Sequence, residues 1–343
     1  MFDADFIVVA RNQSHFTKLC IESILKNIDQ PYHLIVVDNG SSDDTHDYLA
    51  TIKSRIPKDS KITIVFNKEN TGYAGGLNKG LEHSKAKYVL FCNNDIEFYP
   101  RSLREMIRIA ESNERFGLVN PNSNEFEMKS FNPEKLAELQ GRSIERCHTS
   151  GFCVLVKRTV IEKIGGIDME FAPAYFEDMD YAERAKQAGF LCAVALGGYV
   201  YHYGTRTFLS DEKERLWQQN EKLFRSKWGG TKWFGCALRA TELSDVDTRK
   251  EIIAKLLEIA RKEIAVIYIY IPTTYATYFQ NIHNSFRILP TLFGLSGPAV
   301  FLRAMRGGNK KMSRIFVASE NCEKICKHLK VFHRAEVINL LND

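Results

Sequence analysis

The sequence predicts an α/β protein with a mostly parallel sheet flanked by helices, followed by a mainly helical C-terminal extension. Over the first hundred residues, apolar runs of strand length alternate with segments of helical periodicity. The composition, 44% hydrophobic and 26% charged, is that of a globular protein. Because 343 residues exceed one typical domain, we expect a ligand-binding domain at 1–235 and a helical, basic domain at 236–343.

The first four predicted strands and three predicted helices follow one another in a regular order. The alternation indicates βαβ units, and therefore a Rossmann-like, doubly wound nucleotide-binding half. The turn after the second strand is rich in Gly, Ser and Asp, which can cap the helix that follows. In chain order the segments are "DFIVVA" (5–10), "HFTKLCIESILKNI" (15–28), "HLIVVDNGSSDDTHDYLATI" (33–52), "KITIVFN" (61–67), "AGGLNKGLEHSK" (74–85) and "KYVLFCNND" (87–95).

Three further segments complete the predicted domain: a strand in "GFCVLVKRTVIEKIGG" (151–166), an acidic turn leading into a helix (171–190), and a strand in "LCAVALGGYVYHYG" (191–204). Helical periodicity then returns at 244–270, with a capping box from Ser244 to Asp247. The apolar stretch 288–302 is shorter than the roughly 20 residues of a membrane-spanning helix. It either lies in a membrane interface with basic anchors or belongs to a buried helical hairpin.

The net charge of +5 comes from residues 303–343, which hold nine Lys/Arg against four Asp/Glu. Such a tail suits an anionic surface, or is a solvated helical face.

The eight cysteines form no CxxC pair, and several lie in apolar runs, which fits a reducing compartment. The N-terminus lacks the basic start and long apolar run of a signal peptide. We expect a cytoplasmic protein, with peripheral contact to the inner face of the membrane through 287–343.

Polar clusters follow each of the first four predicted strands. They are "ARNQS" (10–14), "DNGSSDD" (38–44), "NKENTGYAGG" (67–76) and "NNDIE" (93–97). In doubly wound sheets, ligands bind at the carboxyl ends of the strands, so one cleft should collect all four clusters. Asp95 in the last cluster could help to hold a divalent metal that neutralises a nucleoside diphosphate.

A second acidic cluster, in "YFEDMDYAERAKQAGF" (175–190), contains Glu177, Asp178 and Asp180. Capping of a helix N-terminus explains Asp180 well. Carboxylates beside apolar neighbours raise one another's proton affinity, which can leave one of them as a general base. His202 ends the next predicted strand and could ligate the same metal as Asp95.

Six segments, in order, resemble the motifs of family 2 glycosyltransferases, which are inverting enzymes with the GT-A fold. The resemblance covers residues 5–230 and is closest to the branch of rhamnosyl- and galactofuranosyltransferases. The segments are "VVARNQSHFTKLCIESIL", "LIVVDNGSSDDT", "NTGYAGGLNKG", "NNDIEFYPRSL", "TSGFCVLVKRTVIEKIGGID" and "YFEDMDYAERAKQAGF".

The resemblance implies a role for each matching residue. Ala10, Arg11 and Asp38 would hold the nucleobase and ribose, and Gly72 and Asn78 would line the diphosphate side. The segment "NND" stands where the family has DxD, so the first aspartate is replaced. The remaining implied roles are nucleotide-sugar binding by Asn93, Asn94 and Glu177, a Mn²⁺ or Mg²⁺ site at Asp95 and His202, and general base catalysis by Asp178.

The resemblance implies transfer of one sugar, with inversion, from a UDP- or dTDP-sugar to a hydroxyl of a glycan or lipid-linked glycan in bacterial cell-surface polysaccharide assembly.

A catalytically impaired sugar-nucleotide-binding protein is the first alternative, because Asn93 replaces an aspartate. A nicotinamide-dependent oxidoreductase is disfavoured, since "GYAGGLNKG" is not GxGxxG. A processive synthase is disfavoured because "QQNEKLFRSKW" lacks the QxxRW spacing. We expect no nucleic-acid partner, and the oligomeric state stays open.

Overall fold

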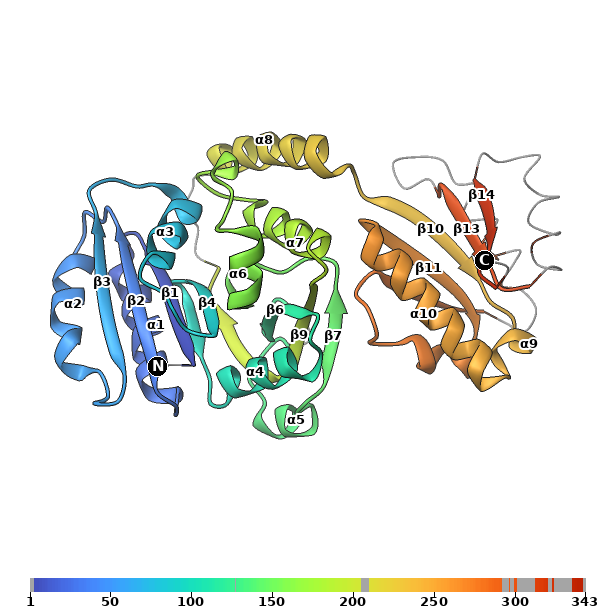
Figure 1. The fold of residues 1–343 in the computed structure, drawn as a ribbon, viewed down its shortest axis with the longest axis horizontal. Helices are drawn as coiled ribbons and strands as arrows, with labels where there is room; N and C mark the ends of the chain where they lie inside the picture. Colours follow the sequence, from blue (N-terminus) through green and yellow to red (C-terminus); the bar gives the residue numbers. More distant parts are fainter. Residues whose placement is uncertain are drawn as a thin grey trace. The chain divides into compact units, whose positions relative to one another are not determined.

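The computed structural model describes residues 3–126, 128–204, 210–291, 296, 299–300, 312–319, 323 and 335–341. The chain divides into two compact units, Met1–Trp228 and Gly229–Asp343 (Figure 1). The boundary expected after residue 235 therefore falls inside the first strand of the second unit. Each unit is described by itself below.

The first unit is built on a nine-stranded mixed sheet in the order β3-β2-β1-β4-β8-β6-β9-β5, with β7 also paired to β9. The four N-terminal strands are parallel, as predicted. The strand β8 enters antiparallel between β4 and β6. The strands are β1 (Ala4–Ala10), β2 (Tyr32–Asn39), β3 (Lys61–Asn67), β4 (Tyr88–Asn93), β5 (Ile96–Phe98), β6 (Phe116–Asn122), β7 (Ser143–Arg146), β8 (Cys153–Lys157) and β9 (Leu191–His202).

Helices pack on both faces of this sheet, so its central strands are buried on both sides (Figure 1). In β1, Phe6 and Val8 join the apolar cluster that includes α1, whereas Ile7 and Val9 join the cluster that includes α3. The helix α3 lies close to the sheet, since a Cβ on Gly80 would collide with Ile7. The helices are α1 (Ser14–Asn27), α2 (Thr45–Thr51), α3 (Gly72–Leu81), α4 (Ser102–Ser112), α5 (Pro133–Glu138), α6 (Arg158–Ile164), α7 (Glu177–Gln187) and α8 (Ser210–Trp228), with 3₁₀ turns at Ile52–Arg55 and Met169–Phe171.

The second unit contains a five-stranded sheet, all parallel, in the order β12-β11-β10-β13-β14. The prediction of a mainly helical extension is therefore wrong for the described residues. The run "AVIYIYIP", predicted as a continuation of the preceding helix, is rich in β-branched and aromatic residues and forms β11. The elements are β10 (Lys232–Ala237), α9 (Ala240–Leu243), α10 (Val246–Lys262), β11 (Ala265–Pro272), a 3₁₀ turn (Thr273–Phe279), β12 (Phe286–Thr291), β13 (Arg314–Val317) and β14 (Glu336–Asn339).

The helix α10 begins at Val246, one residue later than a capping box from Ser244 to Asp247 predicts. Asp245, not Ser244, is its N-cap, and the Asp245 carboxylate accepts a hydrogen bond of 2.7 Å from the backbone N–H of Thr248. The apolar alternation of β11 then places Ile267 and Ile269 in the same cluster as the buried face of α10. This half of the second unit thus repeats the helix-on-sheet packing of the first.

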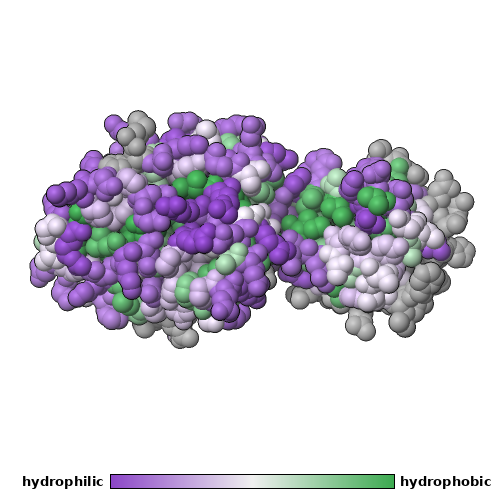
Figure 2. Space-filling model, turned by 90° about the horizontal axis from the view of Figure 1, so that it is seen from below, coloured by the Kyte–Doolittle hydropathy of each residue, from purple (hydrophilic) through white to green (hydrophobic). Residues whose placement is uncertain are grey.

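The proposed membrane-contacting segment is only partly described. Its first residues, 288–291, belong to β12, so they form neither a helical hairpin nor an interfacial helix. Arg303, Arg306, Lys310 and Lys311 lie outside the described residues. Within the described part of the chain, none of the helices has the length and apolar character needed to cross a bilayer. On the face drawn in Figure 2 the first unit is mostly hydrophilic, with small scattered apolar patches.

Candidate active site

The polar segments that follow β1, β2 and β3 are joined by side-chain hydrogen bonds. The backbone N–H of Asn12 donates to Ser41 Oγ at 2.8 Å. Asn39 links the next two segments, because its Nδ2 donates to the carbonyl of Gly72 at 2.9 Å and its Oδ1 accepts from Thr71 Oγ1 at 2.9 Å. The strand-end segments therefore meet at one edge of the sheet, as the topology required.

Three residues with a predicted nucleotide-binding role lie at the ends of the first two strands. Ala10 and Asp38 are register partners across β1 and β2, and both are buried. The Oδ1 atom of Asp38 accepts a hydrogen bond of 3.0 Å from the backbone N–H of Ser41. Arg11 follows β1 directly and is exposed. The structure thus brings these three residues together.

Gly72 and Asn78, both on α3, have different placements. Gly72 has φ +75°, and a Cβ there would lie 2.9 Å from the Cα of Pro173, so the close approach of the two backbones requires glycine. Asn78 holds the backbone of Ile167 on both sides: its Nδ2 donates to the carbonyl and its Oδ1 accepts from the N–H, each at 2.8 Å. This placement makes Asn78 a structural bridge and does not support the implied diphosphate contact.

The segment after β4 supplies the predicted metal residues. Asp95 is buried, and its Oδ1 lies 3.3 Å from Nε2 of His202 at the end of β9. The other ring nitrogen, Nδ1, lies 2.6 Å from Oε1 of Glu125, a residue for which the sequence predicts no role. The ring of Phe152 stacks on His202 at a centroid distance of 5.0 Å. Asn94 points elsewhere, since its Nδ2 donates to Thr17 Oγ1 at 2.9 Å.

These residues fit a divalent metal. A separation of 3.3 Å between Asp95 Oδ1 and His202 Nε2 lets both atoms ligate one ion. A carboxylate behind the second ring nitrogen is the usual way to fix the tautomer of a ligating histidine, and Glu125 is placed to do this. The described residues contain no cluster of three His, Cys, Asp or Glu that could enclose a metal. The pair would therefore leave positions for diphosphate oxygens and water.

The charge of His202 responds to the same carboxylates. Burial lowers its pKa, but the hydrogen bonds that its ring N–H groups donate to Asp95 and Glu125 outweigh burial and raise the pKa of His202 to about 9. Without a metal, protonated His202 is therefore the positive charge between the two carboxylates. A metal bound at Nε2 would have to displace the proton from that nitrogen.

The acidic cluster begins at the N-terminus of α7. Asp178 is half-buried, and both of its oxygens accept backbone hydrogen bonds of 2.8 Å, Oδ1 from Met179 and Oδ2 from Gly151. The hydroxyl of Tyr73, on α3, donates to the carbonyl of Gly151 at 2.8 Å. The carboxylate of Asp178 is therefore oriented by groups from three separate segments.

Glu177 is more deeply buried than Asp178, and its Oε2 has no hydrogen-bond partner among the residues that the structure describes. Desolvation, followed by the neighbouring charge of Asp178, raises the pKa of Glu177 to about 8. Desolvation also raises the pKa of Asp178, although its two backbone donors oppose this. Both side chains line a small, mainly apolar cavity together with Tyr73, Leu77, Phe91, Thr149, Gly151, Val154, Ile167 and Tyr181. At neutral pH we expect Glu177 to be the protonated member of the pair.

We expect Glu177→Gln to stabilise the protein increasingly as pH rises. Below about pH 4.5 Glu177 is protonated in both the folded and the unfolded state, so it does not make the free energy of unfolding depend on pH. Between that pH and about 8 only the unfolded state releases the proton, so the wild type loses stability, on the order of a few kcal/mol in total. Urea midpoints at about pH 5 and about pH 8.5 measure the difference. Glu138→Gln, at an exposed position, is the control, and equal differences at both pH values would contradict the assignment.

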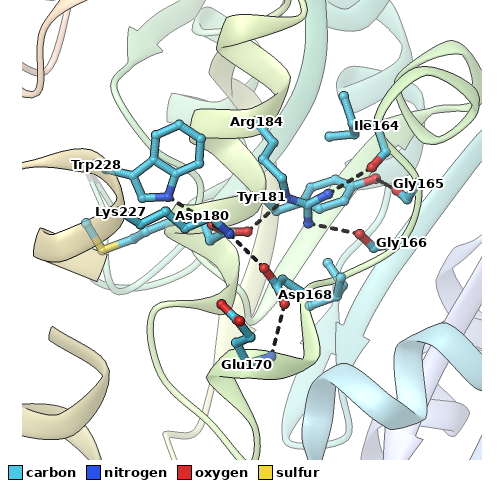
Figure 3. A network of polar contacts seen from close by, with 12 residues as sticks. Ile164, Gly165, Gly166, Asp168, Glu170, Asp180, Tyr181, Arg184, Lys227 and Trp228 are labelled. Carbon is cyan, nitrogen blue, oxygen red and sulfur yellow. Dashed lines mark hydrogen bonds and ion pairs between the residues drawn. The ribbon is translucent and has the colours of Figure 1, made fainter. Parts of the chain in front are cut away.

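Asp180 is a structural residue at the centre of a polar network (Figure 3). It is fully buried and contacts Arg184 Nε at 2.9 Å, Lys227 Nζ at 2.8 Å and Trp228 Nε1 at 2.9 Å. Arg184 also donates to the carbonyls of residues 164 and 166. Asp180 therefore ties α8 and the turn before residue 168 to α7, a larger role than capping.

The fold and the strand-end carboxylates place the first unit in the GT-A class of α/β folds. A crystal structure of GalNAc-T7 with UDP, GalNAc and Mn²⁺ aligns with a TM-score of 0.50 and 10% sequence identity, over 66% of this chain and 48% of that one. Residues 5–165 match the family model described as glycosyl transferase family 2.

Curated relatives match between about a third and a half of the chain. An uncharacterized glycosyltransferase of Rickettsia bellii is 30% identical over 107 residues, which is 31% of this chain and 15% of that protein. The low-salt glycan biosynthesis hexosyltransferase Agl10 of Haloferax volcanii is 25% identical, over 49% of this chain and 57% of its own. The UDP-Glc:alpha-D-GlcNAc-diphosphoundecaprenol beta-1,3-glucosyltransferase WfaP of Escherichia coli is 25% identical, over 51% and 66%. The matches thus cover less than two thirds of each of these relatives.

Proposed function

We propose that the protein is an inverting glycosyltransferase that moves one sugar from a UDP- or dTDP-sugar to a hydroxyl of a glycan or lipid-linked glycan acceptor. The observation that carries this proposal is the placement of Asp178. Its carboxylate is half-buried, is oriented by the N–H groups of Gly151 and Met179, and adjoins Glu177, which we expect to hold the proton of the pair. A fixed, ionised carboxylate is what a general base for a hydroxyl requires.

In the proposed reaction, the acceptor oxygen attacks the anomeric carbon of the donor sugar on the face opposite the diphosphate. The new C–O bond forms as the bond to the diphosphate oxygen breaks, and the acceptor proton passes to Asp178. The anomeric configuration inverts in this single displacement. A Mn²⁺ or Mg²⁺ ion held by Asp95 and His202 would supply charge neutralisation for the departing diphosphate. Asp38, Ala10 and Arg11 would contact the nucleoside, a role that their common position at the ends of β1 and β2 supports.

The relatives support the substrate class of this proposal. Their names describe a hexosyltransferase of glycan biosynthesis and a glucosyltransferase that acts on a diphosphoundecaprenol-linked sugar. The structure with the GT-A fold is described as binding UDP and Mn²⁺. We therefore retain UDP or dTDP as the nucleotide, the rhamnosyl- and galactofuranosyltransferase-like branch, and cell-surface glycan assembly at the inner face of the membrane as parts of the proposal.

Calorimetry with UDP and dTDP, with and without Mn²⁺, tests the proposal. We expect one nucleotide to bind in a metal-dependent way, and the matching nucleotide-sugar to be hydrolysed slowly when water is the acceptor. The alternative of an impaired sugar-nucleotide-binding protein predicts the same binding without hydrolysis or transfer. If neither nucleotide bound, the proposed function would be wrong.

A further inference from the structure

An exposed tryptophan packs against the loop that precedes the proposed catalytic carboxylate. Trp217, on α8, has 44% of its surface exposed. Its ring centroid lies 5.6 Å from that of Tyr175 and 4.9 Å from that of Phe176. These two residues immediately precede Glu177 and Asp178 in the chain. The indole thus packs on a short loop that leads directly into the acidic pair Glu177 and Asp178.

This loop has an unusual backbone that α8 holds in place. Tyr175 and Phe176 have φ values of +75° and +71°, in the left-handed region that non-glycine residues seldom adopt. The buried Asn220, one turn after Trp217, donates through Nδ2 to the carbonyls of Phe171 and Ala174 at 2.8 Å and of Tyr175 at 3.1 Å. The strained turn fixes the direction of both aromatic side chains relative to α7.

The other side of the same loop contacts the segment that the donor is proposed to occupy. The backbone N–H of Tyr73 donates to the carbonyl of Pro173 at 3.1 Å. Pro173 is also the residue against which Gly72 packs. A single loop therefore separates the proposed diphosphate region at the start of α3 from Trp217 on α8, with Asp178 following directly after it.

The surroundings of Trp217 indicate what could cover its ring. The buried residues of α8 are Leu216, Asn220 and Phe224. The remaining neighbours of Trp217 in sequence, from Asp211 to Arg215 and from Gln218 to Gln219, are charged or polar. A protein interface usually needs a contiguous apolar patch, whereas a sugar ring offers one small apolar C–H face rimmed by hydroxyls. An exposed aromatic ring that is held by Tyr175 and Phe176 and flanked in sequence by polar residues suits the sugar better.

We propose that Trp217 and Tyr175 form the binding surface for the acceptor sugar, with the hydroxyl to be glycosylated directed toward Asp178. This inference rests on the proposed function and adds to it the position of the acceptor. The sugar would stack on the indole while its other end enters the space in front of the base. The donor would lie on the other side of this loop, at the start of α3.

The test compares Trp217→Ala and Trp217→Phe with the wild type in two reactions. The first is hydrolysis of the donor sugar-nucleotide by water, which needs no acceptor. The second is transfer to p-nitrophenyl glycosides of glucose, galactose, rhamnose and N-acetylglucosamine, whose binding is also followed by saturation-transfer NMR. We expect Trp217→Ala to lower kcat/KM for the acceptor by roughly tenfold or more, mainly through KM. Trp217→Phe should recover most of the loss, and donor hydrolysis should change less than about twofold.

Tyr278→Ala is the matched control, because Tyr278 is also an exposed aromatic residue but belongs to the second unit. Unchanged acceptor KM and unchanged glycoside binding in Trp217→Ala, with donor hydrolysis intact, would overturn the acceptor surface and leave the proposed function standing. Absence of donor hydrolysis in the wild type would instead count against the proposed function. A change of oligomeric state on sedimentation of Trp217→Ala would assign the ring to self-association and overturn the inference.

Discussion

Asp178→Asn is expected to lower kcat for sugar transfer by about 10²–10⁴-fold, the usual contribution of a general base. The amide keeps the size of the carboxylate and can still accept from the backbone N–H groups of Gly151 or Met179. The loop should therefore keep its shape, and the affinity for UDP or dTDP should change little. Single-turnover transfer and calorimetry on the same preparation measure the two quantities.

The control for Asp178→Asn is Asp247→Asn, an aspartate of the second unit that is 91% exposed at its side chain. This variant should match the wild type in both measurements. Transfer retained by Asp178→Asn would show that another group removes the acceptor proton. Loss of nucleotide binding together with transfer would show that Asp178 holds the donor and does not act as the base.

Asp95→Ala is expected to remove the metal-dependent part of nucleotide binding, a loss of at least tenfold in affinity when Mn²⁺ is present. Without Mn²⁺, the affinities of variant and wild type should be similar, because Asp95 would act on the diphosphate only through the ion. Glu125→Gln offers a graded comparison. It leaves the Asp95 and His202 ligands in place and weakens only the hydrogen bond at His202 Nδ1. We expect a smaller loss of metal affinity from it.

Titration of Mn²⁺ at constant nucleotide, followed by calorimetry, separates these two variants. If nucleotide binding to Asp95→Ala kept its full dependence on Mn²⁺, the metal site would lie elsewhere. If Glu125→Gln were more damaging than Asp95→Ala, Glu125 would be a direct ligand rather than a support for His202.

The parallel half of the first unit could be predicted because each central strand is buried on both faces. Residues of β1 enter two different apolar clusters alternately, so the strand is a continuous apolar run with polar residues at its end. Parallel pairing then brings the carboxyl ends of the strands together, independently of the length and conformation of the loops. The prediction of Asp38 beside Ala10 needed nothing more.

Contacts between distant side chains could not be predicted in the same way. Glu125 lies 77 residues before His202, in a connection with no periodic pattern, and only the pairing of remote strands brings them together. Asn78 shared a segment with apparent donor-binding residues, yet its amide binds Ile167, 89 residues later. In the second unit, the periodicity of α10 ran directly into the apolar residues of β11, and composition alone did not mark the boundary.

The strand order of the second unit makes the C-terminal tail part of its core. β10 is the first of the five strands to be synthesised, yet it pairs with both β11 and β13. One edge of β10 therefore stays unpaired until residues 314–317 have been synthesised. Deleting residues 287–343 would remove β13 and β14 and nearly all of β12. A shortened chain would thus expose the edge of β10 to other molecules and adhere to lipid or protein for that reason alone. Replacing the basic residues of 287–343 one at a time leaves β12, β13 and β14 in the chain. A change in lipid binding then reports on the charge that was removed.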